Sequence, residues 1–189
     1  ADFKPDVAIG VGGYASGPML LAAWVKGIPF YIQEQNSYAG ITNKALSSKA
    51  KQIFVAYPGM EKFFSPSKLI LSGNPVRKDL IDISGKKSAA SKFFGLSLEK
   101  PTILIIGGSQ GARSINHAIL HGLATLSDTP VQIVWQTGIS FESEAKAACE
   151  KYPKLSAYVS AFIYEMDLAY SMADLVISRA GALSVSEIC

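Results

Sequence analysis

Short apolar runs alternate with helix-like stretches along almost the whole chain, and this alternation restricts the fold more than any other feature. The apolar runs are bounded by Gly, Pro, Ser or Asn, which is typical of strands. They cover residues 7–11, 29–34, 52–56, 68–72, 102–106, 131–136, 158–162 and 175–178. Helical patterns lie between them at 16–25, 39–48, 112–126 and 141–151. Because strands that alternate with helices build parallel sheets, the sequence predicts an α/β fold of open, doubly wound sheets.

The alternation breaks at residues 78–100, which are polar, rich in Lys and Ser, and predicted to form a short helix at most. We place a domain boundary at the start of this stretch, which divides the chain into residues 1–77 and 78–189. Each part is too short for a complete doubly wound domain. We therefore expect the C-terminal half of one Rossmann-like domain, then a linker and the N-terminal half of a second, each half with its own parallel sheet. Both chain ends look cut, so we expect a fragment of a longer protein.

The composition is that of a globular chain, with 49% hydrophobic and 17% charged residues. The longest apolar stretch, at 19–25, is too short to cross a bilayer, and nothing resembles a signal peptide, so we expect a soluble or peripheral protein. Cys149 and Cys189 have neither zinc nor C-x-x-C spacing and fit a reducing cytoplasm. Residues 1–77 hold eight Lys and Arg against four Asp and Glu. This basic half could face a phosphate-bearing lipid or membrane surface, although evenly solvated lysines explain it equally well.

Two glycine-rich turns each follow a predicted strand and precede a predicted helix. The first, at 10–17, lets the backbone turn sharply and approach a ligand; Gly10-x-Gly12-x-x-Ala15 also satisfies a loose dinucleotide fingerprint, with Glu34 placed as a ribose ligand. That reading makes an NAD-dependent oxidoreductase one alternative, and a purely structural turn another. In the second turn, at 107–112, backbone amides, the Ser109 hydroxyl and the helix N-terminus could hold a diphosphate. One turn in each half favours a ligand held between two domains.

Further polar residues lie where the carboxyl ends of parallel strands would form a ligand crevice. Gln-Glu-Gln-Asn at 33–36 directly follows a strand, and Arg77 ends the Gly-Asn-Pro-Val-Arg stretch at the predicted hinge. Ser184 and Glu187 have the spacing of a capping box, but Glu187 could instead accept hydrogen bonds from a ribose. His117 and His121 fall opposite the predicted apolar helix face of Ile115, Ile119 and Leu123, so we expect two exposed histidines and no metal site.

Five motifs together resemble the MurG family of glycosyltransferases, family 28, in order and spacing. They are Val-Gly-Gly-Tyr-Ala-Ser-Gly-Pro at 11–18, Gln-Glu-Gln-Asn at 33–36, Gly-Asn-Pro-Val-Arg at 73–77, Gly-Gly-Ser-Gln-Gly-Ala-Arg-Ser-Ile-Asn at 107–116 and Arg-Ala-Gly-Ala-Leu-Ser-Val-Ser-Glu at 179–187. The resemblance implies the GT-B fold, with residues 1–77 from the acceptor-side domain and 78–189 leading into the UDP-sugar donor domain. It also implies inverting transfer of GlcNAc from UDP-GlcNAc to lipid I, the lipid-linked muramyl-pentapeptide, giving lipid II for peptidoglycan synthesis.

The same resemblance implies a set of site residues and a cellular location. Donor-binding residues would be Asn36, Arg77, Ser109, Ile163, Ala182, Leu183, Ser184, Val185, Ser186 and Glu187, and acceptor-side residues would be Gly12, Gly13, Tyr14 and Glu34. The catalytic residue stays unknown, because the His usually proposed as base in the family lies in a loop preceding Ala1; a later Gln-rich segment is also outside the chain. We expect a peripheral protein on the cytoplasmic side of the bacterial membrane, with no cofactor, metal or nucleic-acid partner. A non-catalytic nucleotide-binding module is a further alternative.

Overall fold

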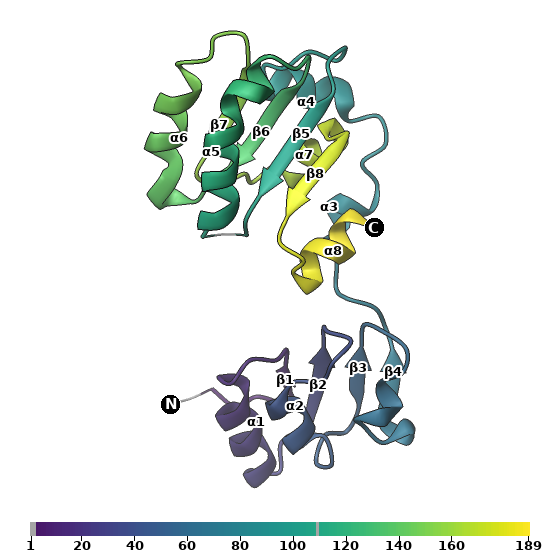
Figure 1. The fold of residues 1–189 in the computed structure, drawn as a ribbon. Helices are drawn as coiled ribbons and strands as arrows, with labels where there is room; N and C mark the ends of the chain where they lie inside the picture. The colour runs from purple at the N-terminus through teal and green to yellow at the C-terminus, as the bar shows by residue number, and fades with distance from the viewer. Residues whose placement is uncertain (1–2, 109) are drawn as a thin grey trace. The chain divides into compact units, whose positions relative to one another are not determined.

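The computed structural model describes residues 3–108 and 110–189 and divides the chain into two compact units, Ala1–Pro75 and Val76–Cys189 (Figure 1). Each unit has its own parallel sheet, with strand order β1-β2-β3-β4 in the first and β7-β6-β5-β8 in the second. The prediction of an α/β fold with two separate parallel sheets is confirmed. No helix within the described ranges combines the length and apolarity needed to cross a membrane.

The first unit packs its helices and one face of its sheet into a single core. Its elements are β1 Ala8–Gly10, α1 Ser16–Val25, β2 Phe30–Glu34, α2 Ile41–Leu46, β3 Ile53–Val55, the 3-10 turns Met60–Lys62 and Pro66–Lys68, and β4 Leu69–Leu71. Phe30, Ile32 and Ile53 on the strands are buried against Leu20 of α1 and Leu46 of α2. The alternate strand positions are less covered.

The strands of the first sheet have near-continuous apolar sequences, which are typical of strands covered on both faces, but one of their faces is less covered than the other. Ile9 is 64% exposed, and Tyr31 and Phe54 are only partly buried in the part of the chain that the structure describes. The near-continuous apolar sequence of these strands therefore reflects more apolar surface than the described residues cover.

The second unit has helices on both faces of its sheet. Its elements are α3 Lys78–Ile81, α4 Lys87–Phe94, β5 Thr102–Ile106, α5 Arg113–Ser127, β6 Gln132–Gln136, the 3-10 turn Ile139–Phe141, α6 Glu142–Cys149, β7 Ser156–Ser160, α7 Met166–Met172, β8 Leu175–Ser178 and α8 Ala182–Ile188. In Figure 1, α5 and α6 lie on one face of this sheet, with α4 and α7 on the other. The buried side chains form a separate cluster on each face, because alternate strand residues such as Leu104 and Ile105 point to opposite sides.

Residues 78–100 are a structural part of the second unit, and the expectation of a short helix at most was wrong. They form α3 and α4, and α4 packs against α7. Leu80, Ala90, Phe94 and Leu96 from this stretch are buried in the same cluster as Leu104. The Lys and Ser residues that made the segment look like a linker occupy mostly exposed or partly exposed positions, so the composition hid a narrow apolar face.

Candidate functional site

The strand order of the second sheet creates a crevice beside β5. The chain runs from β5 outward through β6 and β7, then returns to add β8 on the other side of β5. Where the order of a parallel sheet reverses in this way, the loops at the strand ends diverge and leave room for a ligand. A cavity of about 430 Å³ lies there, and its wall includes Ile106 and Gln136, the last residues of β5 and β6. The cavity is lined by Arg77, Ile106, Gly108, Gln136, Phe162, Ile163, Met166, Tyr170, Leu183, Ser184 and Glu187. We call it the switch-point cavity.

The glycine-rich turn after β5 is held close to the segment after β6. A Cβ at Gly111, where φ is +74°, would lie 2.0 Å from the Thr137 carbonyl oxygen, so only glycine fits. Buried Asn116 of α5 reinforces this contact: its Nδ2 donates to Thr137 O at 2.7 Å, and its Oδ1 accepts from Trp135 Nε1 at 3.1 Å. The turn is therefore fixed at the N-terminal end of α5. Ser109, the predicted donor contact in this turn, lies outside the described residues.

Gln136 connects two walls of the switch-point cavity. Its Nε2 donates to the Gly108 carbonyl at 3.1 Å, and its Oε1 accepts from the Ile163 backbone N–H at 2.9 Å. The side chain is 5% exposed. The N–H of Ile163 is thus engaged within the fold. Sequence reasoning missed Gln136, although it is a polar residue ending an apolar strand, the same signal that singled out residues 33–36.

Glu187 is bound to Tyr170 and does not close a capping box. Helix α8 begins at Ala182 with Gly181 as its N-cap and no side-chain cap, so Ser184 lies inside the first turn. The capping-box interpretation was therefore wrong. Instead, the Tyr170 hydroxyl donates to Glu187 Oε2 at 3.1 Å. Burial, followed by the adjacent Glu187 carboxylate, raises the pKa of the Tyr170 hydroxyl well above its usual value.

The predicted donor residues of the second unit divide between the cavity wall and its surroundings, whereas Asn36 belongs to the first unit. Arg77 is exposed, with Asp79 at 4.0 Å, a separation at which an exposed pair contributes little. Its guanidinium is thus available to the cavity it lines. The cavity lining includes Arg77, Ile163, Leu183, Ser184 and Glu187 but not Ala182, Val185 or Ser186. Ser186 Oγ donates to Ala182 O at 2.9 Å, within helix α8.

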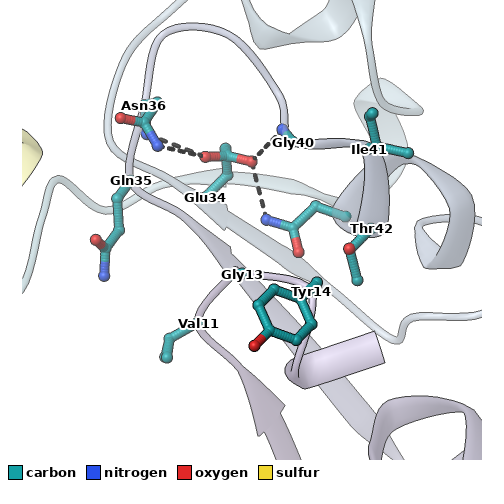
Figure 2. Close-up of a pocket in the computed structure, with 11 residues that line it drawn as sticks. Val11, Gly13, Tyr14, Glu34, Gln35, Asn36, Gly40, Ile41 and Thr42 are labelled. Carbon is teal, nitrogen blue, oxygen red and sulfur yellow. Dashed lines mark hydrogen bonds between the residues drawn. The ribbon is translucent and has the colours of Figure 1, made fainter. Parts of the chain in front are cut away.

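The first unit has a smaller cavity of about 310 Å³ between the glycine-rich turn after β1 and the loop after β2. The predicted residues Gly12, Gly13, Tyr14, Glu34 and Asn36 all line it (Figure 2). The remaining lining residues are Val11, Gln35, Gly40, Ile41, Thr42 and Asn43. The two motifs that define it, 11–18 and 33–36, meet because β1 and β2 are parallel neighbours whose carboxyl ends share one edge.

The Glu34 carboxylate at the base of this cavity is fully engaged. Oε1 accepts from the backbone N–H of Asn36 at 3.1 Å and from its Nδ2 at 3.3 Å. Oε2 accepts from the Gly40 N–H at 2.9 Å and from Asn43 Nδ2 at 2.9 Å. The residue is 3% exposed. A carboxylate so occupied is poorly placed to bind the ribose of a dinucleotide.

Sequence analysis did not identify Asn43 and gave no role to Asn74, two amide residues near this cavity. Asn43 of α2 is buried and lines the cavity, yet one polar residue in a helical pattern gave no signal. Asn74, from the Gly-Asn-Pro motif, accepts from Gln33 Nε2 at 3.3 Å and donates to the Gln35 carbonyl at 3.2 Å. The motif thus anchors the loop after β2.

The histidines and cysteines are placed as ordinary surface or packing groups. His117 and His121 are exposed on α5, as predicted, while Ile119 and Leu123 on the opposite face are buried. Burial raises the pKa of the Cys149 thiol, which disfavours the reactive thiolate. Within residues 3–108 and 110–189, no group of three or more His, Cys, Asp or Glu residues is arranged to hold a metal ion.

Comparison with known proteins places both units in one family. Residues 1–55 match the glycosyltransferase family 28 N-terminal domain, and residues 102–189 match the glycosyltransferase family 28 C-terminal domain. A curated relative from Parabacteroides distasonis, named UDP-N-acetylglucosamine--N-acetylmuramyl-(pentapeptide) pyrophosphoryl-undecaprenol N-acetylglucosamine transferase, is 56% identical over 100% of this chain and 51% of its own length. A relative of the same name from Bacteroides fragilis is 53% identical over 99% of this chain and 50% of its own length. The chain spans about half the length of the curated relatives it matches.

Solved structures give the same picture. The crystal structure of Acinetobacter baumannii MurG is 37% identical, covers 97% of this chain and 49% of its own, and has a TM-score of 0.66. The UDP-GlcNAc 2-epimerase from Neisseria meningitidis, at 16% identity and a TM-score of 0.62 over 95% of this chain and 55% of its own, shares the fold alone. Since both domain models, the curated relatives and the MurG structure agree, the chain belongs to glycosyltransferase family 28.

Proposed function

We propose that the chain is part of an inverting glycosyltransferase that moves GlcNAc from UDP-GlcNAc to lipid I and so makes lipid II for peptidoglycan synthesis. The names of the curated relatives, at 50–56% identity over nearly the full chain, support this reaction. The observation that carries the proposal is the switch-point cavity, because five predicted donor residues from distant parts of the sequence line it together.

The chemistry of that cavity suits a UDP-sugar. Arg77 supplies a fixed positive charge for the diphosphate, and Glu187 supplies acceptor oxygens for ribose hydroxyls. The segment at Ile163 forms an apolar wall for the uracil. The turn before α5 adds the N-terminal end of a long helix, which favours an anion. In the inverting reaction, the acceptor hydroxyl attacks the anomeric carbon and the bond to UDP breaks. Arg77 and this helix end would stabilise the charge that grows on the departing diphosphate.

The cavity of the first unit is proposed for the acceptor side. Gly12, Gly13 and Tyr14 form one wall, and Tyr14 is 90% exposed and free to contact a substrate. The engaged Glu34 carboxylate counts against the NAD alternative, which needs that carboxylate for a ribose. At Gly10, an added Cβ would lie 2.4 Å from Leu20 Cδ1, so close packing of α1 accounts for this glycine without a nucleotide.

The first unit also supports a peripheral position on the cytoplasmic face of the membrane. Helix α1 exposes Met19, Leu21, Trp24 and Val25. Lys49 lies 3.6 Å from the centroid of the Trp24 ring, so a positive charge adjoins this apolar strip. Apolar side chains beside lysines favour the headgroup region of an anionic membrane.

Calorimetric titration with UDP tests the donor site. Arg77→Ala should weaken UDP binding by about 2 kcal/mol, the contribution of a charge-assisted hydrogen bond. Lys78→Ala, which removes the neighbouring exposed charge, is the matched control and should bind UDP like the wild type. Binding of NADH in preference to UDP, or equal UDP affinity in all three proteins, would refute the assignment. A protein that binds UDP but transfers no GlcNAc to lipid I in its full-length form would instead be a non-catalytic module.

A further inference from the structure

We infer that Glu34 acts as a positioning residue for Asn36 and does not itself contact substrate. The inference rests on the proposed function and on the expectation, from the family resemblance, that Asn36, which lines the cavity of the first unit, contacts a substrate. Glu34 is 3% exposed, whereas Asn36 is exposed at the cavity edge. The buried carboxylate and the exposed amide are joined by two hydrogen bonds, one to the backbone and one to the side chain. Glu34 therefore fixes both where Asn36 lies and how its amide is turned.

The hydrogen-bond partners of Glu34 are all donors. Asn36 N–H, Asn36 Nδ2, Gly40 N–H and Asn43 Nδ2 all donate to its two oxygens. Each carboxylate oxygen thus accepts two hydrogen bonds. Hydrogen bonds to a charged acceptor are stronger than those between neutral groups, which suits a group that must hold a loop in one conformation.

The orientation of the Asn36 amide follows directly. Because Nδ2 is drawn toward Glu34, Oδ1 is left pointing away from the carboxylate (Figure 2). An outward carbonyl oxygen accepts hydrogen bonds, so it selects a donor such as a sugar hydroxyl or an amide N–H. A phosphate oxygen, which is itself an acceptor, would be repelled by this atom. Glu34 thus determines which groups of a bound substrate Asn36 can recognise.

The other side of the carboxylate fastens the loop to the following helix. Gly40 is the N-cap of α2 and Asn43 lies one turn into that helix. Both donate to Oε2, so residues 35–40 are held between β2 and α2 by one side chain. Since Glu34 is itself the last residue of β2, the sheet supports the position of Asn36 through this carboxylate, in addition to the hydrogen bond that Asn74 donates to the Gln35 carbonyl.

The inference is tested by exchanging the hydrogen-bond donor and acceptor between positions 34 and 36. The measurement is kcat/KM for UDP-GlcNAc and lipid I in the full-length protein. Asn36→Ala gives the contribution of Asn36 and tests the proposed function by itself. Asn36→Asp keeps an oxygen at the outward position but sets a second carboxylate against Glu34, so it should lose about tenfold or more, as Asn36→Ala does. Because Asn36 is exposed, both variants should fold. Glu34→Gln should also lose about tenfold, since the amide nitrogen replaces one carboxylate oxygen and meets two donors, either those of Asn36 or those of Gly40 and Asn43.

The double variant Glu34→Gln/Asn36→Asp tests directly whether the two side chains act through their mutual hydrogen bond. The amide introduced at position 34 can donate to the carboxylate introduced at position 36, so the double variant should recover at least about threefold in kcat/KM over either single variant. Unchanged turnover in Asn36→Ala would refute the proposed contact of Asn36. A clear loss in Asn36→Ala combined with wild-type behaviour of Asn36→Asp, or with additive losses in the double variant, would refute the positioning role of Glu34 alone. Melting temperatures of all variants identify any loss that is due to unfolding.

Discussion

Replacing Tyr170 with Phe removes one oxygen from the wall of the switch-point cavity and tests whether Glu187 is held in place. A hydrogen bond to a charged acceptor contributes about 1.5–3 kcal/mol when both groups are buried. Here the O···O distance is 3.1 Å, whereas charge-assisted O–H···O bonds are typically about 2.5–2.7 Å. Tyr170 is 8% exposed, but Glu187 is only partly buried, so water can replace the lost donor. We therefore expect the free energy of unfolding to fall by about 1 kcal/mol.

The effect of Tyr170→Phe should depend on pH in a defined direction. Burial and Glu187 raise the pKa of the Tyr170 hydroxyl, so the folded protein keeps this proton at a pH where the unfolded chain has lost it. The stabilising contribution of the hydroxyl is complete below the ordinary tyrosine pKa of about 10 and decreases as the pH rises beyond it. The stability difference between wild type and Tyr170→Phe should thus be largest below about pH 10 and shrink above it.

Urea denaturation at about pH 8 and about pH 11, together with UDP titration, measures both effects. UDP affinity should fall about three- to tenfold in Tyr170→Phe, because a released Glu187 must be ordered again on binding. Tyr158→Phe is the control, since Tyr158 packs edge-on against Phe94 with ring centroids 4.9 Å apart in the same apolar cluster. Equal stability and UDP affinity of wild type and Tyr170→Phe, or a stability difference that widens above about pH 10, would refute the reasoning.

Two further predictions concern the framework of the second unit. Gly111→Ala would place a Cβ 2.0 Å from the Thr137 carbonyl oxygen at a residue with positive φ, so the free energy of unfolding measured in urea should fall by about 3 kcal/mol or more. In the control Gly122→Ala, the new Cβ meets open space on α5, so the free energy of unfolding should rise by about 0.5–1 kcal/mol. The Thr102 N–H donates to Asp174 Oδ2 at 2.8 Å and lowers the pKa of that carboxyl group. The ionised Asp174 therefore stabilises the fold at neutral pH, and this stabilisation is lost as the pH falls through the folded-state pKa. Asp174→Asn should accordingly cost under about 1 kcal/mol near neutral pH and progressively less below about pH 4; a loss that persists in acid would contradict this.

The strands were predictable because their signal is local. Residues 102–106 and 175–178 were predicted with the bounds that the structure has, since a short apolar run bounded by turn residues carries all the information needed. The segment at 156–160 was predicted two residues late, because Ser156 and Ala157 precede the apolar Tyr158 and Val159. Within residues 78–100 the sequence predicted a short helix at most and did not place α4, for a related reason: Ala90 and Phe94 form a two-residue apolar face among Lys and Ser, and this face is recognisable only from its packing against α7.

Many of the predicted residues that line a cavity come from motifs that carry several of them. Gly12, Gly13 and Tyr14 come together from a single turn, and Leu183, Ser184 and Glu187 from a single helix. Gln136, Tyr170 and Asn43 each stand outside the recognised motifs, so their sequence context gives no sign of a role in a site. Their roles depend on partners 9 to 28 residues away in the sequence, such as Glu34 for Asn43 and Gly108 for Gln136.

Proposed ligand contacts and the residues that hold them in place differ in their burial. This difference has a physical reason. A side chain that binds a substrate must stay partly exposed, as the proposed contacts Arg77 and Asn36 are, and exposure leaves its rotamer free. Ordering that side chain at each binding event costs affinity, and a buried partner with fixed geometry reduces the cost. Glu34 for Asn36 and Tyr170 for Glu187 are such partners, each drawn from a different element of its unit's core. Variants of these buried partners should therefore change substrate affinity and turnover while the exposed site residues remain intact.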